Sequence, residues 1–167
     1  MDGSMVTKTG KPWAKPGDEL VVYHGTAGDF GVFDATKAST ASMHATAYMG
    51  HYFSASPSVA SDFIPEKWDM TVWPTQVEKK QGGNVMPVYL SLRNPYEMPL
   101  AEFRKMVSNG RMKSGVDQAE RLRQQLERQG YDGIHIPGDP ALVETMGGDE
   151  WSADTWIAFR PEQIKSA

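Results

Sequence analysis

The stretch Leu20-Val21-Val22-Tyr23-His24-Gly25-Thr26 decides how this chain is interpreted. Its apolar first half predicts a buried strand, which stops at a histidine followed by glycine, the residue whose backbone other groups approach most closely. A second stretch, Gly50-His51-Tyr52-Phe53-Ser54-Ala55-Ser56, predicts a glycine turn, an aromatic pair and then serine and proline punctuation. A polar ring and an aromatic plate at two strand ends, beside an open glycine backbone, are suited to hold a flat ligand that carries an amide.

Composition predicts one domain with a buried core, because the chain has 167 residues of which 40% are hydrophobic. The net charge of -4 gives no general attraction to nucleic acid or to an anionic membrane. The absence of cysteine excludes disulfides, thiolate metal sites and thiol nucleophiles. No apolar run approaches the roughly 18 residues of a membrane span, and the N-terminus lacks the apolar core of a signal peptide. We therefore expect a cytoplasmic monomer with no membrane contact.

The pattern of elements predicts an α+β fold. Residues 1–18 read as a flexible lead-in that begins with a remnant of an expression tag, and residues 19–167 form the domain. Strands are expected at 20–23, in a run ending at 52–53, and at 85–92, 133–136 and 156–159; helices are expected at 56–63, 100–107 and 116–129. A loop with a short helix suits 30–47, and a loop or irregular hairpin suits 65–84. This order lacks a regular strand–helix–strand repeat, so a doubly wound sheet is not expected.

Four short stretches give the chain a family resemblance: Tyr23–Thr26, Gly50–Phe53, Gly130–Ile134 and Phe159–Ser166. In this order they resemble the ADP-ribosyltransferase superfamily of the poly-ADP-ribose-polymerase and diphtheria-toxin type. The small members found in phage and mobile-element polyvalent proteins are the most similar. The resemblance implies a single domain with a split, strongly bent mixed sheet and NAD in the cleft between its halves.

The resemblance also implies roles for individual residues. His24 matches the histidine that holds the nicotinamide-side ribose, and the backbone of Gly25 matches the group that binds the carboxamide. Tyr52 matches the tyrosine that stacks on the nicotinamide ring, and Phe63 falls where the family has a second stacking aromatic. The implied NAD-binding residues are His24, Gly25, Thr26, Tyr52, Phe53 and Phe63.

The third motif departs from the family pattern. The family has a glutamate at the start of the last strand, where this chain has Thr155. A threonine hydroxyl can donate a hydrogen bond but brings no charge, and preorganised charge is commonly the largest catalytic contribution. We expect the neighbouring Asp154 to assist, which requires a bulge because adjacent strand residues face opposite sides. Asp149 and Glu150 are alternatives in the preceding loop. The implied catalytic residues are His24, Tyr52, Asp154 and Thr155.

The expected function is transfer of a single ADP-ribose unit from NAD to a macromolecular acceptor, with release of nicotinamide. NAD is consumed as a substrate, no metal is implied, and analogy places the protein in a bacterial or phage-infected cell. One alternative is a catalytically weakened module that binds NAD, ADP-ribose or another protein. Another is an ADP-ribosyltransferase directed at nucleic acid. The sequence leaves the acceptor open.

Other prominent residues have simpler interpretations. The remaining histidines are expected to be structural, because they form neither a helical pair nor a zinc-like spacing: His44, His51 and His135. The arginines of the predicted helix at 116–129 are expected on its solvated face. The region 65–84 combines tryptophans with lysines, and we expect a lid that packs on the core, with stacking on nucleic-acid bases as the alternative.

Overall fold

The computed structural model describes residues 20–26, 33, 45–64, 66–69, 76–79, 83–108, 113–144 and 151–167. The strands are β1 (Leu20–Thr26), β2 (His51–Ser54), β3 (Glu66–Asp69), β4 (Gln76–Lys79), β5 (Asn84–Leu90), β6 (Pro95–Glu97), β7 (Gly133–Ile136), β8 (Thr155–Ala158) and β9 (Ile164–Ser166). The helices are α1 (Pro57–Asp62), α2 (Leu100–Ser108) and α3 (Lys113–Arg128), with the short 3-10 helices η2 (Ala45–Met49), η3 (Pro140–Glu144) and η5 (Pro161–Gln163).

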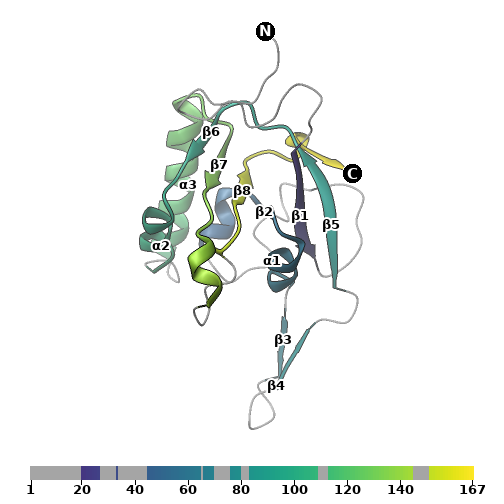
Figure 1. The fold of residues 1–167 in the computed structure, drawn as a ribbon. Helices are drawn as coiled ribbons and strands as arrows, with labels where there is room; N and C mark the ends of the chain where they lie inside the picture. Colours follow the sequence, from purple (N-terminus) through teal and green to yellow (C-terminus); the bar gives the residue numbers. More distant parts are fainter. Residues whose placement is uncertain are drawn as a thin grey trace.

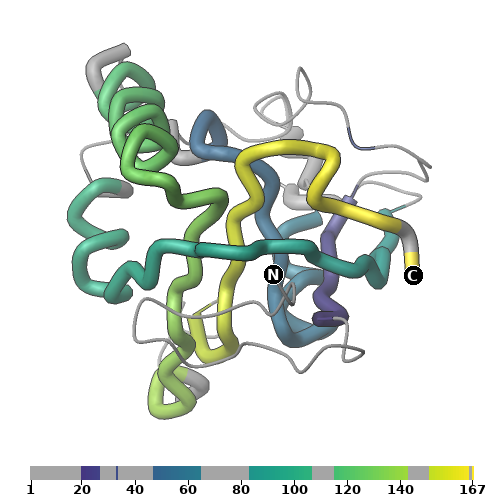
Figure 2. Tube along the Cα trace, turned by 90° about the horizontal axis from the view of Figure 1, so that it is seen from above, coloured from purple at the N-terminus to yellow at the C-terminus, as the bar shows by residue number. Residues whose placement is uncertain are grey.

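One mixed sheet forms the body of the molecule. Its seven strands follow the order β6-β7-β8-β2-β1-β5-β9, and β3 pairs with β4 in a separate antiparallel ribbon. The β6–β7 pair is parallel, whereas β8 pairs antiparallel with both β7 and β2. In Figure 1, α2 and α3 lie toward β6 and β7, α1 lies beside β1, and the β3–β4 ribbon projects away from the sheet. Figure 2 gives the order of β7, β8 and β1 from above. The chain is a single α+β domain, as predicted.

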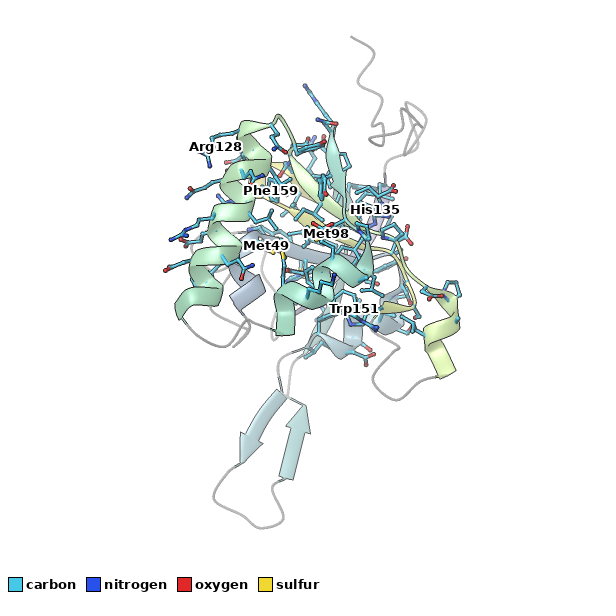
Figure 3. All side chains as sticks on the ribbon, turned by 90° about the vertical axis from the view of Figure 1, so that its left-hand side faces the viewer. Met49, Met98, Arg128, His135, Trp151 and Phe159 are labelled. Atoms are coloured by element: carbon cyan, nitrogen blue, oxygen red, sulfur yellow. The ribbon has the colours of Figure 1, made fainter. Side chains whose placement is uncertain are left out.

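Each face of the sheet carries a buried apolar cluster. The helix face carries a cluster that includes residues of η2, α2 and α3: Met49, Met98, Phe103, Ala119, Leu126, Ile134, Ile136, Ile157 and Phe159. The opposite face carries a second cluster: Val22, Phe53, Val88, Leu90, Leu92, Trp156, Ala158 and Ile164. Consecutive residues of β8 alternate between the two clusters, as strand geometry requires. In Figure 3, Met49, Met98 and Phe159 lie between α3 and the sheet, and His135 lies away from α3.

Two of the stretches that carry the family resemblance, Gly130–Ile134 and Phe159–Ser166, stabilise the sheet through hydrogen bonds. The carboxylate of Asp132 accepts hydrogen bonds from the backbone N–H groups of Arg93 and Asn94, at 2.6 and 2.9 Å. The side chain of Gln163 donates to the carbonyl of Asp132 at 2.7 Å and accepts from the N–H of Arg160 at 2.9 Å. These contacts tie the segment before β7 to the turn before β9, so these residues serve the fold.

The structure extends and corrects several sequence expectations. β1 continues through His24 to Thr26, where it still pairs with β5, so the first motif lies inside the strand. The three-residue strands β6 and β9 were not expected, because they are too short to produce a periodic pattern. β8 begins at Thr155, one residue earlier than expected. The β3–β4 ribbon confirms a hairpin within 65–84, although Trp73 and Lys80 lie outside the described residues, as do His44 and the lead-in at 1–18.

We predict that Gly25→Ala destabilises the protein by about 1–3 kcal/mol, the usual range for overpacking. A Cβ atom at Gly25 would lie 2.0 Å from the carbonyl oxygen of Ala60 in α1, so the helix must move away from β1. Equilibrium unfolding in urea measures the change. The matched control is Gly130→Ala, where a Cβ meets nothing within 4 Å and only the φ of +88° opposes the substitution. Equal stability of Gly25→Ala and the wild type would contradict the close packing of α1 on β1.

Candidate functional site

The sheet parts between β1 and β2. β1 pairs with β5 along its whole length, from Leu20 to Thr26, but it pairs with β2 only where Tyr23 faces Ser54. Beyond that pair, the side chain of His24 spans the gap, and its Nδ1 lies 2.8 Å from the backbone carbonyl oxygen of Tyr52. A carbonyl oxygen can only accept, so Nδ1 carries the hydrogen. The neutral ring then presents Nε2 as an acceptor.

The ring of His24 is enclosed by aromatic side chains. Its centroid lies 5.2 Å from that of Phe33 and 5.4 Å from that of Phe53. Burial lowers the pKa of His24 below its ordinary value of 6.5, and the hydrogen bond to Tyr52 opposes this effect more weakly. His24 is therefore neutral at pH 7, in the tautomer that the Tyr52 carbonyl selects. Phe53 is only 2% exposed and supports His24 from the core.

The C-terminal end of α1 packs against Gly25. Ser56 caps the start of this short helix through a hydrogen bond from the N–H of Val59, and proline occupies its first turn. At the other end, the position of a Cβ on Gly25 lies 3.2 Å from the backbone nitrogen of Ile64, next in sequence to Phe63. Phe63 remains 37% exposed, which leaves ring surface for a ligand. Thr26 ends β1 and is buried at 8% exposure.

Tyr52 and Thr155 share the helix face of the sheet. Tyr52 packs against the helix-face cluster, and its ring centroid lies 6.3 Å from that of Phe103. Thr155 faces Ser54 on β2 and Ile136 on β7, and directly paired residues point to the same side of a sheet. Thr155 is 1% exposed, and within the described part of the chain its hydroxyl has no hydrogen-bond partner. A buried polar group without a partner marks a place where a ligand can supply one.

Asp154 points to the opposite face. Its carboxylate lies 2.8 Å from Nε2 of His135 and accepts a hydrogen bond from the N–H of Gly138 at 2.9 Å. The ring of His135 stacks on Trp156, a member of the opposite-face cluster, with centroids 4.1 Å apart. The contact with His135 lowers the pKa of Asp154 below its ordinary value of 3.8, and burial opposes this more weakly. For Asp154 to reach a ribose beside Thr155, it would have to exchange these partners for the ligand.

Several residues near the site gave no sequence signal. Sequence reasoning treated His135 as structural without finding its partner, because Asp154 lies far along the chain. Phe103 and Trp151, whose ring centroids are 5.0 Å apart, extend the aromatic contact of Tyr52 toward the segment that leads to Thr155. Ser54 is buried and accepts a hydrogen bond from the N–H of Ser56 at 3.1 Å. The alternative acids Asp149 and Glu150 lie outside the described residues.

Among the residues that the structure describes, no group of three or more His, Asp or Glu side chains is placed to hold a metal ion. Among the same residues, no helix combines the length and the apolar character that a membrane crossing needs.

Comparison with known proteins gives a family match over nearly the whole chain. The family model described as ADP-Ribosyltransferase in polyvalent proteins matches residues 14–167. No curated protein and no solved structure matches the chain.

We predict that His24 makes the stability of the protein depend on pH. The unfolded chain binds a proton near pH 6.5, whereas folded His24 binds it only at lower pH, so stability falls as the pH drops below 6.5 and levels off below the folded pKa. Urea unfolding between about pH 5 and 8, where histidine titrates, measures this loss. His24→Gln can still donate to the Tyr52 carbonyl but cannot titrate, so its loss is smaller. Parallel profiles for the two proteins would contradict the lowered pKa.

Proposed function

Since the chain belongs to the family of ADP-ribosyltransferases in polyvalent proteins, we propose that it moves a single ADP-ribose unit from NAD to a macromolecular acceptor. The observation that carries this proposal is the contact between His24 and Tyr52. These residues come from two separate motifs, and they meet where the sheet parts, with Nδ1 of His24 2.8 Å from the Tyr52 carbonyl. Such a gap gives a flat ligand access to backbone groups that a continuous sheet would pair.

The proposed NAD site uses the polar and aromatic groups around this gap. Nε2 of neutral His24 accepts a hydrogen bond from a ribose hydroxyl at the gap, from the sheet face that carries Phe53. Tyr52 and Thr155 approach the ligand from the helix face, and the backbone of Gly25 binds the carboxamide. The rings of Tyr52 and Phe63 hold the nicotinamide, and a stacked ring gains about 0.5–1.5 kcal/mol per pair beyond burial. The neutral, half-buried state of His24 and the exposure of Phe63, next in sequence to the Ile64 that packs on Gly25, support these roles.

The proposed reaction replaces one bond at the anomeric carbon of the ribose with another. The bond to the nicotinamide nitrogen breaks, and nicotinamide leaves with the electron pair. The acceptor atom supplies the new electron pair and releases its proton to water. The hydroxyl of Thr155 has no partner among the described residues and binds a ribose hydroxyl while positive charge builds on the ring. A direct part for the carboxylate of Asp154 stays a prediction, and it requires release of His135 and Gly138.

A second candidate function is a weakened member that binds NAD or ADP-ribose and transfers slowly or not at all. The observation that favours it is the neutral side chain of Thr155 at the start of β8, where the family has a carboxylate. Loss of one preorganised group that stabilises charge costs roughly 100- to 1,000-fold in rate. The two candidates share the same NAD site and differ in turnover.

We predict that the protein labels an acceptor when it is incubated with biotin-tagged NAD and bacterial lysate. Protein and nucleic-acid fractions are separated afterwards, so the labelled fraction identifies the acceptor class. His24→Ala and Tyr52→Ala lose the label, whereas the control Tyr48→Ala, a tyrosine 38% exposed in η2, keeps it. Wild-type protein that binds NAD but labels neither fraction would contradict transfer and favour the binding module.

We predict that Thr155→Val separates stability from activity. The hydroxyl of Thr155 is buried without a partner in the described structure, and such a group costs about 1–3 kcal/mol. Removing it leaves the ligand-free protein at least as stable as the wild type in urea unfolding. Transfer from NAD falls because the ribose loses its partner, while Thr155→Ser keeps the hydroxyl and most of the activity. If Thr155→Val transferred as fast as the wild type, the hydroxyl would not contact the ribose.

A further inference from the structure

The residues that follow β7 lie side by side with those that precede β8. We call this junction, residues 136–139 and 151–155, the neck. Ile136 at the end of β7 pairs with Thr155 at the start of β8, so both ends of the segment between these strands lie side by side. The N–H of Asp139 donates to the carbonyl of Trp151 at 2.9 Å and closes the neck further out. The return path ends in Thr155, so the contacts that fix the neck also fix this residue.

Asp154 ties three parts of the chain together at this neck. One carboxylate oxygen lies 2.8 Å from Nε2 of His135 on β7, and the other accepts from the N–H of Gly138 on the outgoing path. The main-chain carbonyl of Asp154 accepts from the N–H of Ala55, just beyond β2, at 2.9 Å. The residue before Thr155 is therefore held from β7, from the loop and from β2.

His135, the partner of Asp154, is buried and in contact with residues of two neighbouring strands. It is 5% exposed, and its ring stacks on Trp156 at an angle of 27°. Its Nδ1 lies 3.9 Å from the carboxylate of Glu97 on β6. The pKa of Asp154 is lowered mainly by its contact with His135, so the carboxylate is ionised at neutral pH and accepts the hydrogen from Nε2.

The helix face gives the neck a second support. Trp151, on the return path, contacts Phe103 of α2 with ring centroids 5.0 Å apart, and Phe103 contacts Tyr52 at 6.3 Å. The neck is thus connected to Tyr52 on one face and to His135 on the other. Neither His135 nor Asp154 reaches the helix face, where Tyr52 and Thr155 lie.

We propose that His135 is a positioning residue for the transfer reaction: its contact with Asp154 fixes the main chain that presents Thr155 to the ribose beside Tyr52. This inference rests on the proposed function. It implies that Asp154 acts by holding the main chain through its hydrogen bonds, and that its charge is less important. An orphan hydroxyl is useful to a substrate only if its direction is fixed, and small displacements near a reacting centre cost about 100-fold in rate.

The two roles of Asp154 make different predictions for Asp154→Asn. An asparagine carbonyl still accepts from Gly138, and its amide donates to the other tautomer of His135, so the neck is kept. A carboxylate that acted directly on the ribose would be lost as completely as in Asp154→Ala. His135→Gln and His135→Leu test the same hydrogen bond from the histidine. Of these two variants, only glutamine can donate a hydrogen bond to Asp154.

The test measures three quantities for these four variants: the dissociation constant of NAD, kcat for transfer, and hydrogen exchange of the Gly138 and Ala55 amides without NAD. We expect kcat to fall about 10-fold or more in Asp154→Ala and His135→Leu, as alignment is lost, while NAD binding stays within about threefold. Both amides exchange faster in these two variants. Asp154→Asn and His135→Gln stay near the wild type. The control is Glu97→Gln, which removes the carboxylate near Nδ1 and leaves the neck intact.

Two outcomes would overturn the positioning role. An equal loss of kcat in Asp154→Asn and Asp154→Ala would mean that the charge of Asp154 itself is needed. An unchanged kcat in His135→Leu would mean that the contact between His135 and Asp154 is not needed. Thermal unfolding of each variant identifies one that fails to fold, and the Asp154 pair then decides. Wild-type protein that binds NAD without transferring it would overturn the proposed function, and the positioning role with it.

Discussion

The hydrogen bond from the His24 ring to the Tyr52 carbonyl is the interaction on which the proposed site depends. β1 and β2 share one pair, Tyr23 with Ser54, and then part. A parted sheet leaves backbone groups that need partners, since buried polar groups without them cost about 1–3 kcal/mol each. The histidine supplies the partner for one of these groups from its own side chain. The contact links the two strands across the gap and holds the ring in one tautomer, so it serves stability and, in the proposed site, the binding of the ribose.

The gap is stable because its two sides are held independently. On one side, β5 pairs with β1 along its full length, and α1 packs so closely on Gly25 that no side chain fits there. On the other side, β8 pairs with every residue of β2 and joins both apolar clusters. Neither side needs the missing β1–β2 pairs to be ordered. The sheet is therefore divided into two supported halves that meet at His24 and Tyr52.

Elements of the fold that depend on neighbouring residues in the sequence could be predicted, whereas those that depend on residues far along the chain could not. The apolar run of β1, the Ser56 cap of α1 and the periodicity of α3 are local signals, and the corresponding elements formed where expected. The strands β6 and β9 owe their existence to partners far along the chain, and three residues cannot carry a period. The same holds for His135, because its partner Asp154 and its neighbour Trp156 lie far along the chain, just before β8 and within it. The resemblance placed Thr155 at the start of the last strand, whereas the apolar pattern began that strand at Trp156, and neither gave an account of what fixes Thr155 there.

The identity of residue 155 bears on both folding and the proposed chemistry. Its side chain is buried against both neighbouring strands, at a position where an unpaired hydroxyl costs about 1–3 kcal/mol. A carboxylate there would cost considerably more without a partner, because burying an isolated charge is far more expensive than burying a hydroxyl. The same burial would strengthen its attraction to a positively charged ribose. Threonine therefore lowers the cost to the fold and gives up the stronger electrostatic contribution. In the proposed site, such an exchange leaves alignment as the main contribution of this strand end, which agrees with the proposed positioning role of the hydrogen bonds around Asp154.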